Sequence, residues 1–147
     1  MVSFNFKLLI KDDEKTADKL LLFRKGISPT WEDNVNKKGG NFCLEMKLVN
    51  SEQMDKIWKK LLLIVIGESW EFSEYVTGIR IVDRQKKHTT LKVEIWVTFG
   101  FMNPEFSKEQ FRALKDKFRV SMFQQIDEFY KCIEDDIFYT DHGRKLN

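Results

Sequence analysis

The feature that most constrains this chain is a strict alternation of apolar and polar residues near its middle. One set, at every second position, is apolar: Leu91, Val93, Ile95, Val97 and Phe99. The positions between them hold Lys92, Glu94, Trp96 and Thr98. Side chains of a strand point alternately to its two faces, so the pattern predicts a strand with one face in a core. Trp96 then falls on the polar face, the wrong side for a core residue.

Other segments predict partners for this strand. GIRIVDR (78–84) precedes it across a polar QKKHT segment, as in a hairpin. Residues 42–48 alternate in the same way, with the core side at Phe42, Leu44, Met46 and Leu48. The alternation over 2–10 predicts a first strand. We therefore expect a mostly antiparallel sheet.

Two helices are expected on one face of this sheet. The first begins at an N-cap, Asn50, with Gln53 as the reciprocating residue, and ends near Gly67. The second begins at Ser107 with Gln110. The pattern over 122–133 favours helix, although IDEFY followed by an acidic turn is also compatible with a last strand. The final HGRKLN is expected to be mobile. Together these elements predict an α+β fold.

Size and composition limit the function classes. A chain of 147 residues suits a single domain over 1–147, and 42% hydrophobic residues are enough for a core. The formal charge is only +2, so a strongly cationic body that wraps nucleic acid is excluded and any anion site must be local. No apolar run reaches the about 18 residues of a membrane span. With no leader pattern at the start either, we expect a cytoplasmic protein without membrane contact.

Enzyme motifs are missing from the sequence. It contains no GxxxxGK[ST], GxGxxG, HExxH or GxSxG pattern, which disfavours a kinase or hydrolase. Cys43 and Cys132 form no CxxC pair and no metal-ligand spacing with His88 or His142. We expect no enzyme activity, no cofactor and no metal.

The residues that suggest chemistry are two tryptophans outside the core pattern and a basic hairpin. Trp31 lies in a loop beside Glu32, and Trp96 lies on a polar strand face, so both rings are expected to be unpaired. The hairpin carries Arg84, Lys86, Lys87 and Lys92. An indole stacks on a base, a carboxylate accepts from a guanine edge and cations hold phosphates. The alternative is two core-packed rings and a solvated basic hairpin.

Three segments, in order, resemble the eukaryotic translation initiation factor 4E family, which binds the 5′ cap of mRNA. They are LFRKGISPTWEDxxNxxGG, DKIWKKLLLIVIGE and GIRIVDRxxxxxxxLKVEIWV, and the resemblance covers about residues 20–100. It implies a curved antiparallel sheet with helices on the convex face and the cap on the concave face. It also implies that Trp31 stacks on 7-methylguanine and that Glu32 accepts from the base. By the same resemblance Trp96 lies against the cap methyl group, and Arg84, Lys86 and Lys92 hold the phosphates.

The chain departs from the family at the first stacking ring. The family holds the cap between two tryptophans, and no tryptophan precedes Trp31 here. We expect residues 11–19 to form a loop where that ring would be, and the helix that follows it to be deleted or reduced to a short turn at 17–23. One stacked ring is worth about 1–3 kcal/mol, so weaker cap binding is expected unless Phe4, Phe6 or a partner supplies a ring.

The resemblance also predicts a protein-binding surface on the first helix. Its residues are Trp58, Lys59, Lys60, Leu62, Leu63 and Gly67. In the family this surface receives a Tyr-x-x-x-x-Leu helix of scaffold or repressor proteins, and a leucine and a glutamate stand where this chain has the two lysines. An arginine-bearing partner helix would be repelled, so the partner is altered or the interaction is lost. For at least one of the two leucines, core packing is the alternative.

We therefore predict a monomeric protein that binds capped mRNA, through its 7-methyl-GTP moiety, in translation initiation. One alternative is an interaction protein or decoy that has lost cap affinity with the upstream tryptophan. A nucleotide hydrolase acting on caps is a further alternative, with little support in the motifs.

Overall fold

The structure is a computed structural model that describes residues 6–13, 17–47, 50–66, 70–83, 90–127, 131 and 136–146. In this part of the chain, six strands form one antiparallel sheet in the order β1-β2-β4-β5-β3-β6. The strands are β1 (Phe6–Asp13), β2 (Ala17–Arg24), β3 (Gly40–Lys47), β4 (Val76–Asp83), β5 (Thr90–Val97) and β6 (Phe138–Asp141). The two long helices are α1 (Ser51–Ile66) and α2 (Lys108–Asp127). Short 3₁₀ helices span Asn36–Lys38, Ser73–Tyr75 and Gly143–Leu146.

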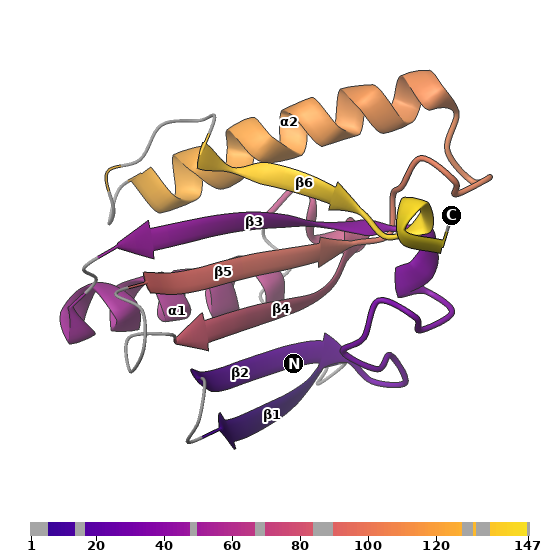
Figure 1. The fold of residues 1–147 in the computed structure, drawn as a ribbon. Coiled ribbons are helices and arrows are strands. Elements are labelled where there is room, and N and C mark those ends of the chain that lie inside the picture. The colour runs from indigo at the N-terminus through magenta and orange to yellow at the C-terminus, as the bar shows by residue number, and fades with distance from the viewer. Residues whose placement is uncertain are drawn as a thin grey trace.

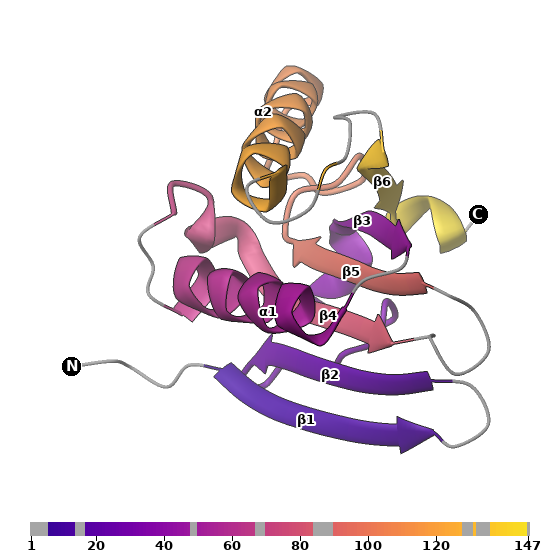
Figure 2. The same cartoon turned by 90° about the vertical axis from the view of Figure 1, so that its left-hand side faces the viewer.

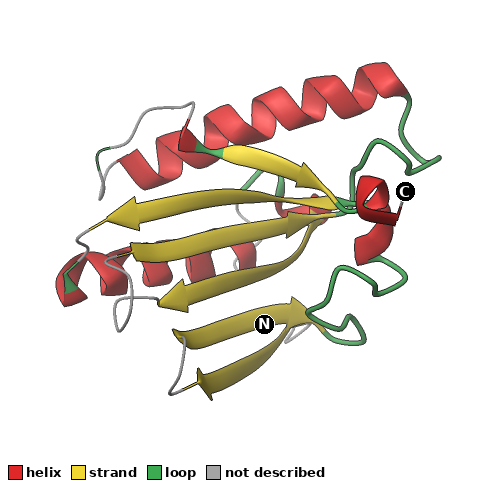
Figure 3. Cartoon of the chain, in the orientation of Figure 1, coloured by secondary structure: helices red, strands yellow, loops and turns green. Residues whose placement is uncertain are grey.

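Both long helices cover the same face of the sheet, as Figures 1 and 2 show. The apolar sides of α1 and α2 join the inward residues of the strands in one large cluster. The rings of Phe42 and Phe118 stack with centroids 4.4 Å apart, which fixes α2 against β3. Burial of each such side chain contributes about 1.5–3 kcal/mol. The predicted α+β fold, with a curved sheet and helices on its convex face, is confirmed (Figure 3).

The helix starts follow the predicted capping residues. Before α1, the backbone N–H of Gln53 donates to the side-chain oxygen of Asn50, and the Asn50 N–H donates to the side chain of Gln53. Ser107 and Gln110 make the same reciprocal pair before α2. Each reciprocal pair is a capping box, which satisfies two backbone N–H donors that a helix start otherwise leaves without partners.

The N-terminal expectations are wrong in one respect. Residues 11–13 and 17–19, predicted as a loop, belong to strands, and 17–23 form part of β2 rather than a reduced helical turn. The register pairs the two strands from Phe6 with Arg24 to Asp13 with Ala17. Leu20 to Phe23 form a continuous apolar run, as in a strand buried on both faces: Leu20 and Leu22 join the large cluster under the helices, and Leu21 and Phe23 pack on the opposite face. Phe4 lies outside the described residues, and no side-chain position is described for Phe6.

The C-terminal segment is ordered by contacts with the sheet. The α2 helix extends to Asp127, so the helical interpretation of the tail is confirmed up to that residue. The strand that follows is β6, which pairs with β3 at the sheet edge. His142, expected in a mobile tail, is only 1% exposed, and its backbone N–H donates to the carbonyl of Gly39. That expectation of mobility is wrong for this residue because β6 brings it against the loop before β3.

The opposite face of the sheet has a small apolar cluster of its own. Leu21, Phe23 and Trp96 form its buried part, with Ile27 and Trp31 packed against it. Phe23 of β2 stands directly opposite Gly78 of β4. A Cβ atom added at Gly78 would lie 2.2 Å from the Phe23 ring. The absence of a side chain at this glycine therefore lets the phenylalanine ring lie flat over the sheet.

We predict that Gly78→Ala destabilises the protein by about 1–3 kcal/mol, because the new methyl group displaces the Phe23 ring from Trp96. Urea unfolding of the two proteins measures this. In a Phe23→Ala background the same substitution should cost much less, because the clash is gone. An equal cost in both backgrounds would show that the ring is not the reason for the glycine.

Candidate nucleotide-binding site

The loop that carries Trp31, residues 25–39, is fixed by hydrogen bonds from two of its own side chains. The carboxylate of Asp33 accepts from the backbone N–H groups of Ser28 and Val35, both at 2.9 Å. The amide nitrogen of Asn36 donates to the carbonyls of Ser28 (2.8 Å) and Thr30 (3.0 Å). Asp and Asn suit such turns because their short side chains bond to nearby backbone groups. The backbone on either side of Trp31 is thereby held before any ligand binds.

Asn36 also connects this loop to the rest of the protein. It is 1% exposed, and the Thr77 hydroxyl of β4 donates to its side-chain oxygen at 3.0 Å. Its backbone carbonyl lies 2.8 Å from Nδ1 of His142, which therefore donates to it. Nε2 of the same histidine lies 2.8 Å from Oδ1 of Asn41 on β3. Buried polar groups with partners on β3, β4 and the C-terminal segment thus hold the loop at one end of the sheet.

The sequence analysis assigned no role to Asn36, Asn41 or His142. Asn36 is the last residue of the WEDxxN pattern in the first family-like segment, so this pattern could have indicated a role for it. His142 had none, because its partners lie 106 and 101 positions away in the sequence.

Trp96 lies on the face predicted for it, but it is not unpaired. The ring is only 5% exposed, with the Phe23 ring edge-on at 5.3 Å and the His142 ring at 4.6 Å. Its indole N–H donates to Oε1 of Glu94 at 3.3 Å. The expectation of an unpaired ring is wrong because β2 and the C-terminal segment cover this part of the polar face. Any contact between Trp96 and a ligand must use the small exposed part of the ring.

Trp31, with Glu32 next to it in the chain, lies beside the cluster that contains Trp96, on the face of the sheet opposite the helices. Trp31 is half-buried and packs against the cluster of Leu21, Phe23 and Trp96, so the second ring is not unpaired either. Glu32, the next residue, is exposed. An aromatic ring and a free-standing carboxylate on a fixed loop can together contact the face and the edge of one base.

Charged side chains continue along the same face of β5. Lys92 lies on that face four residues before Trp96, which corresponds to about 13 Å along a strand. Arg80 on β4 stands opposite Glu94 in the register, and its Nη1 lies 3.1 Å from Oε2 of that carboxylate. Lys92 Nζ lies 3.9 Å from the same oxygen. The sequence analysis did not single out Arg80, although the hairpin alternation places it on the polar face. Arg84, Lys86 and Lys87 lie outside the described residues.

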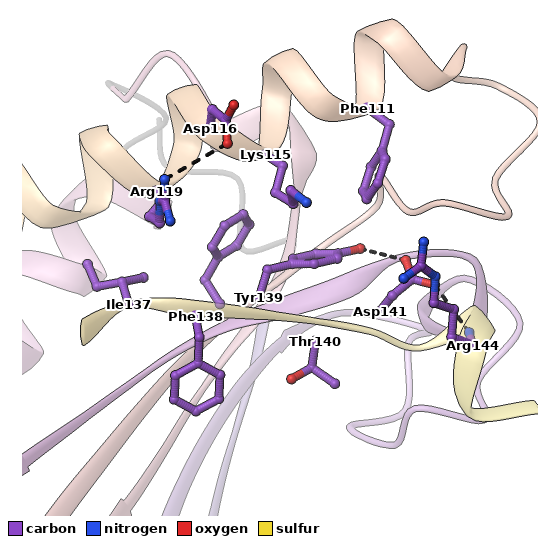
Figure 4. A pocket seen from close by; sticks show the side chains of 11 residues that line it. Phe111, Lys115, Asp116, Arg119, Ile137, Phe138, Tyr139, Thr140, Asp141 and Arg144 are labelled. Atoms are coloured by element: carbon purple, nitrogen blue, oxygen red, sulfur yellow. Dashed lines mark hydrogen bonds and ion pairs between the residues drawn. The ribbon is translucent and has the colours of Figure 1, made fainter. Parts of the chain in front are cut away.

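A cavity of about 550 Å³ lies elsewhere, between α2 and β6 (Figure 4). Tyr139 points into it from β6, and its hydroxyl donates to Asp141 at 2.8 Å. Burial, together with Asp141, raises the pKa of Tyr139 well above its usual range. Arg144 also lines this cavity, with its guanidinium 4.3 Å from the centre of the Phe101 ring. Because Tyr139 faces α2, this cavity lies on the helix side of β6, apart from Trp31.

The predicted protein-binding surface on α1 divides into two ridges. Trp58 and Leu62, four residues apart, are half-buried and pack on the core. Lys59 and Leu63 form the outer ridge, where Leu63 is 67% exposed. Lys60 is half-buried. Core packing is therefore correct for Leu62 and not for Leu63. Gly67 lies outside the described residues.

This arrangement defines the class of the protein: an α+β domain with a single curved sheet, two helices on one face and an aromatic loop against the other. The sequence profile described as "Eukaryotic initiation factor 4E" matches residues 6–145. The chain belongs to the eukaryotic initiation factor 4E family. Among curated relatives, it is 34% identical over 99 residues to eukaryotic translation initiation factor 4E1 of Drosophila melanogaster, and 38% identical over 79 residues to eukaryotic translation initiation factor 4E of Homo sapiens.

The matched segments are partial. They cover 67% and 52% of this chain but only 37% and 35% of the Drosophila and human proteins, little more than a third of each relative's own length. In the part of the chain that the structure describes, no helix has the length and apolar character needed to span a membrane.

Solved structures share the fold. The complex of C. elegans eIF4E-3 with the 4E-binding protein Mextli matches 90% of this chain and 68% of its own, with a TM-score of 0.68 and 21% identity. The complex of Ascaris suum eIF4E-3 with m7G cap matches 85% of this chain and 62% of its own, with a TM-score of 0.61 and 25% identity.

We predict that Asn36→Ala loosens the Trp31 loop and lowers the free energy of unfolding by about 1–3 kcal/mol, because the carbonyls of Ser28 and Thr30 and the buried Thr77 hydroxyl lose their partner. Urea unfolding gives the energy, and the rate of limited proteolysis within residues 25–39 reports the loop. Asn34→Ala, at an exposed position of the same loop, is the matched control. If both variants behave alike, Asn36 does not hold the loop.

Proposed function

We propose that this protein binds the 7-methylguanosine 5′ cap of mRNA and acts in translation initiation in the cytoplasm. The observation that carries the proposal is the fixed loop that presents Trp31 and the exposed Glu32 beside the concave-face cluster. Membership of the family supports it, as does the relative from Ascaris suum that is solved with m7G cap.

In this proposal the Trp31 ring stacks on the methylated base. N7-methylation gives the base a formal positive charge, and an indole face attracts such a cation by about 2 kcal/mol or more once water is excluded. Glu32 accepts hydrogen bonds from the ring and amino nitrogens of the guanine edge. The exposed part of Trp96 lies against the methyl group. The site thus selects the methylated base over plain guanine.

The phosphates of the cap extend along β5 toward the β4–β5 hairpin. Lys92 is 24% exposed on this face and supplies one cation. Arg84 and Lys86, at the hairpin, supply the others. Arg and Lys both bind phosphate oxygens through charge-assisted hydrogen bonds. Because a single described ring faces the base, affinity is expected to be below that of a site with two stacking rings.

A second candidate function rests on the exposed ridge of α1. Leu63 is 67% exposed and Lys59 lies one turn before it, so an apolar side chain stands in a basic surface. A partner helix that carries leucine and acidic residues suits this surface better than an arginine-bearing Tyr-x-x-x-x-Leu helix. In this alternative the protein is an adaptor or decoy that has lost cap affinity. The complexes of relatives with 4E-binding proteins support a protein partner of some kind.

We predict that the protein is retained on a 7-methyl-GTP resin and is eluted by 7-methyl-GTP but not by the same concentration of GTP. Trp31→Ala should weaken retention by about 5- to 150-fold, the equivalent of one stacked ring. Val35→Ala, at an exposed position in the same loop, is the matched control and should leave retention unchanged. Elution by GTP as readily as by the methylated nucleotide would contradict the proposal. Absence of retention, with protein partners captured equally by wild type and Trp31→Ala, would favour the adaptor function.

A further inference from the structure

One charged group on the concave face has a role that the proposed function does not explain. Among the described residues, Glu94 is the only acidic side chain in the buried class, at 3% exposure. A buried carboxylate is costly unless cations and hydrogen-bond donors compensate it. Glu94 stands on β5 between Trp96 and Lys92, at the point where the proposed base site meets the proposed phosphate site.

The contacts of Glu94 involve both of its oxygens. Oε1 accepts from the indole N–H of Trp96 at 3.3 Å. Oε2 accepts from Nη1 of Arg80 at 3.1 Å and lies 3.9 Å from Nζ of Lys92. The first cation is within hydrogen-bond distance and the second is not. Arg80 is therefore the close partner of this carboxylate, and Lys92 is held only by the longer-range attraction.

Both cations reach solvent on the face where phosphates would arrive. The side chains of Arg80 and Lys92 are 30% and 24% exposed, whereas that of Glu94 is 4% exposed. A phosphate oxygen that binds Lys92 must compete with the Glu94 carboxylate for the ammonium group. Glu45 also stands opposite Lys92 in the register, but it is exposed, so water and salt screen its charge more strongly.

We propose that Glu94 is a built-in competitor for polyphosphate: it keeps Arg80 as its own counter-ion and holds Lys92 loosely, so that a bound polyphosphate must draw Lys92 away. The ligand class, a nucleoside polyphosphate, rests on the proposed function. The competition lowers the share of affinity that comes from phosphates, which every nucleoside triphosphate carries. Because this cost is the same for methylated and plain nucleotides, it lowers the affinity for both without changing the ratio between them, and binding then depends more strongly on recognition of the base.

The test compares Glu94→Gln with wild type by isothermal titration. The amide keeps the shape of the side chain and one acceptor oxygen for Trp96 or Arg80, and it removes the negative charge. The variant should bind 7-methyl-GTP at least about threefold more tightly, the upper part of the range for a partly exposed ion pair. Its affinity for the 7-methylguanosine nucleoside should stay within about twofold of wild type, because the nucleoside has no phosphate.

Two further variants assign the effect. In a Lys92→Met background, Glu94→Gln should give no gain over Lys92→Met alone, because Lys92 is the cation released. Glu105→Gln makes the same change of charge at an exposed position before α2 and should leave binding unchanged. Weaker or unaltered 7-methyl-GTP binding by a folded Glu94→Gln protein would overturn the proposal. So would a gain that persists without Lys92.

Failure of the proposed function can be told apart from failure of this inference. Inorganic tripolyphosphate serves as a second probe that needs no base site, and Glu94→Gln should bind it more tightly too. If wild type does not bind 7-methyl-GTP, the proposed function fails, and the tripolyphosphate comparison alone decides the role of Glu94. If the Glu94→Gln protein does not fold because Arg80 has lost its counter-ion, a double variant is used. Glu94→Ala with Arg80→Val removes both members of the ion pair and leaves Lys92 in place. That variant should bind tripolyphosphate more tightly than Arg80→Val, which keeps the Glu94 carboxylate, and no difference between these two variants would overturn the inference.

Discussion

The hydrogen bonds between Asn36, His142 and Asn41 determine where the candidate site lies. They join the Trp31 loop and the start of β3, which are adjacent in the sequence, to the segment after β6, which lies 106 and 101 positions further along the chain. Because the groups are buried, water cannot replace a lost partner, and each bond therefore supports the others. Trp31 lies within the loop that they fix, and the His142 ring covers part of Trp96. The position of the Trp31 loop thus depends on one small polar network, which also supplies one of the rings that cover Trp96.

The two faces of the sheet differ in chemistry. Its helix-covered face carries the large apolar cluster with α1 and α2, which makes the strands rigid. Its other face carries a small aromatic cluster and the charged row of Arg80, Glu94 and Lys92. The side chains of this charged row lie outside the large apolar cluster, so a change of charge there leaves that cluster intact. A site that recognises a charged ligand can therefore be adjusted there, as the proposed competition at Glu94 illustrates.

Sequence reasoning predicted what depends on local periodicity and local capping. The alternation around Trp96, the boxes at Asn50 and Ser107 and the β4–β5 hairpin all have signals within a few residues. It missed what depends on distant contacts. The burial of Trp96 comes from Phe23 and from a histidine in the tail, and neither was visible from the spacing around the tryptophan. The β1–β2 hairpin was missed because the charged residues over 11–19 resemble a loop in composition, whereas its register with β4 makes it a strand pair.

The proposed function depends on one fixed tryptophan, Trp31, whose ring distinguishes the charged, methylated base from plain guanine. A titration of intrinsic tryptophan fluorescence with 7-methyl-GTP and with GTP tests it most directly, because stacking quenches the indole emission. We expect saturable quenching by 7-methyl-GTP, with GTP binding more weakly by about tenfold or more, as a cation–π contribution of about 2 kcal/mol implies. Equal quenching by the two nucleotides, or none by either, would contradict it.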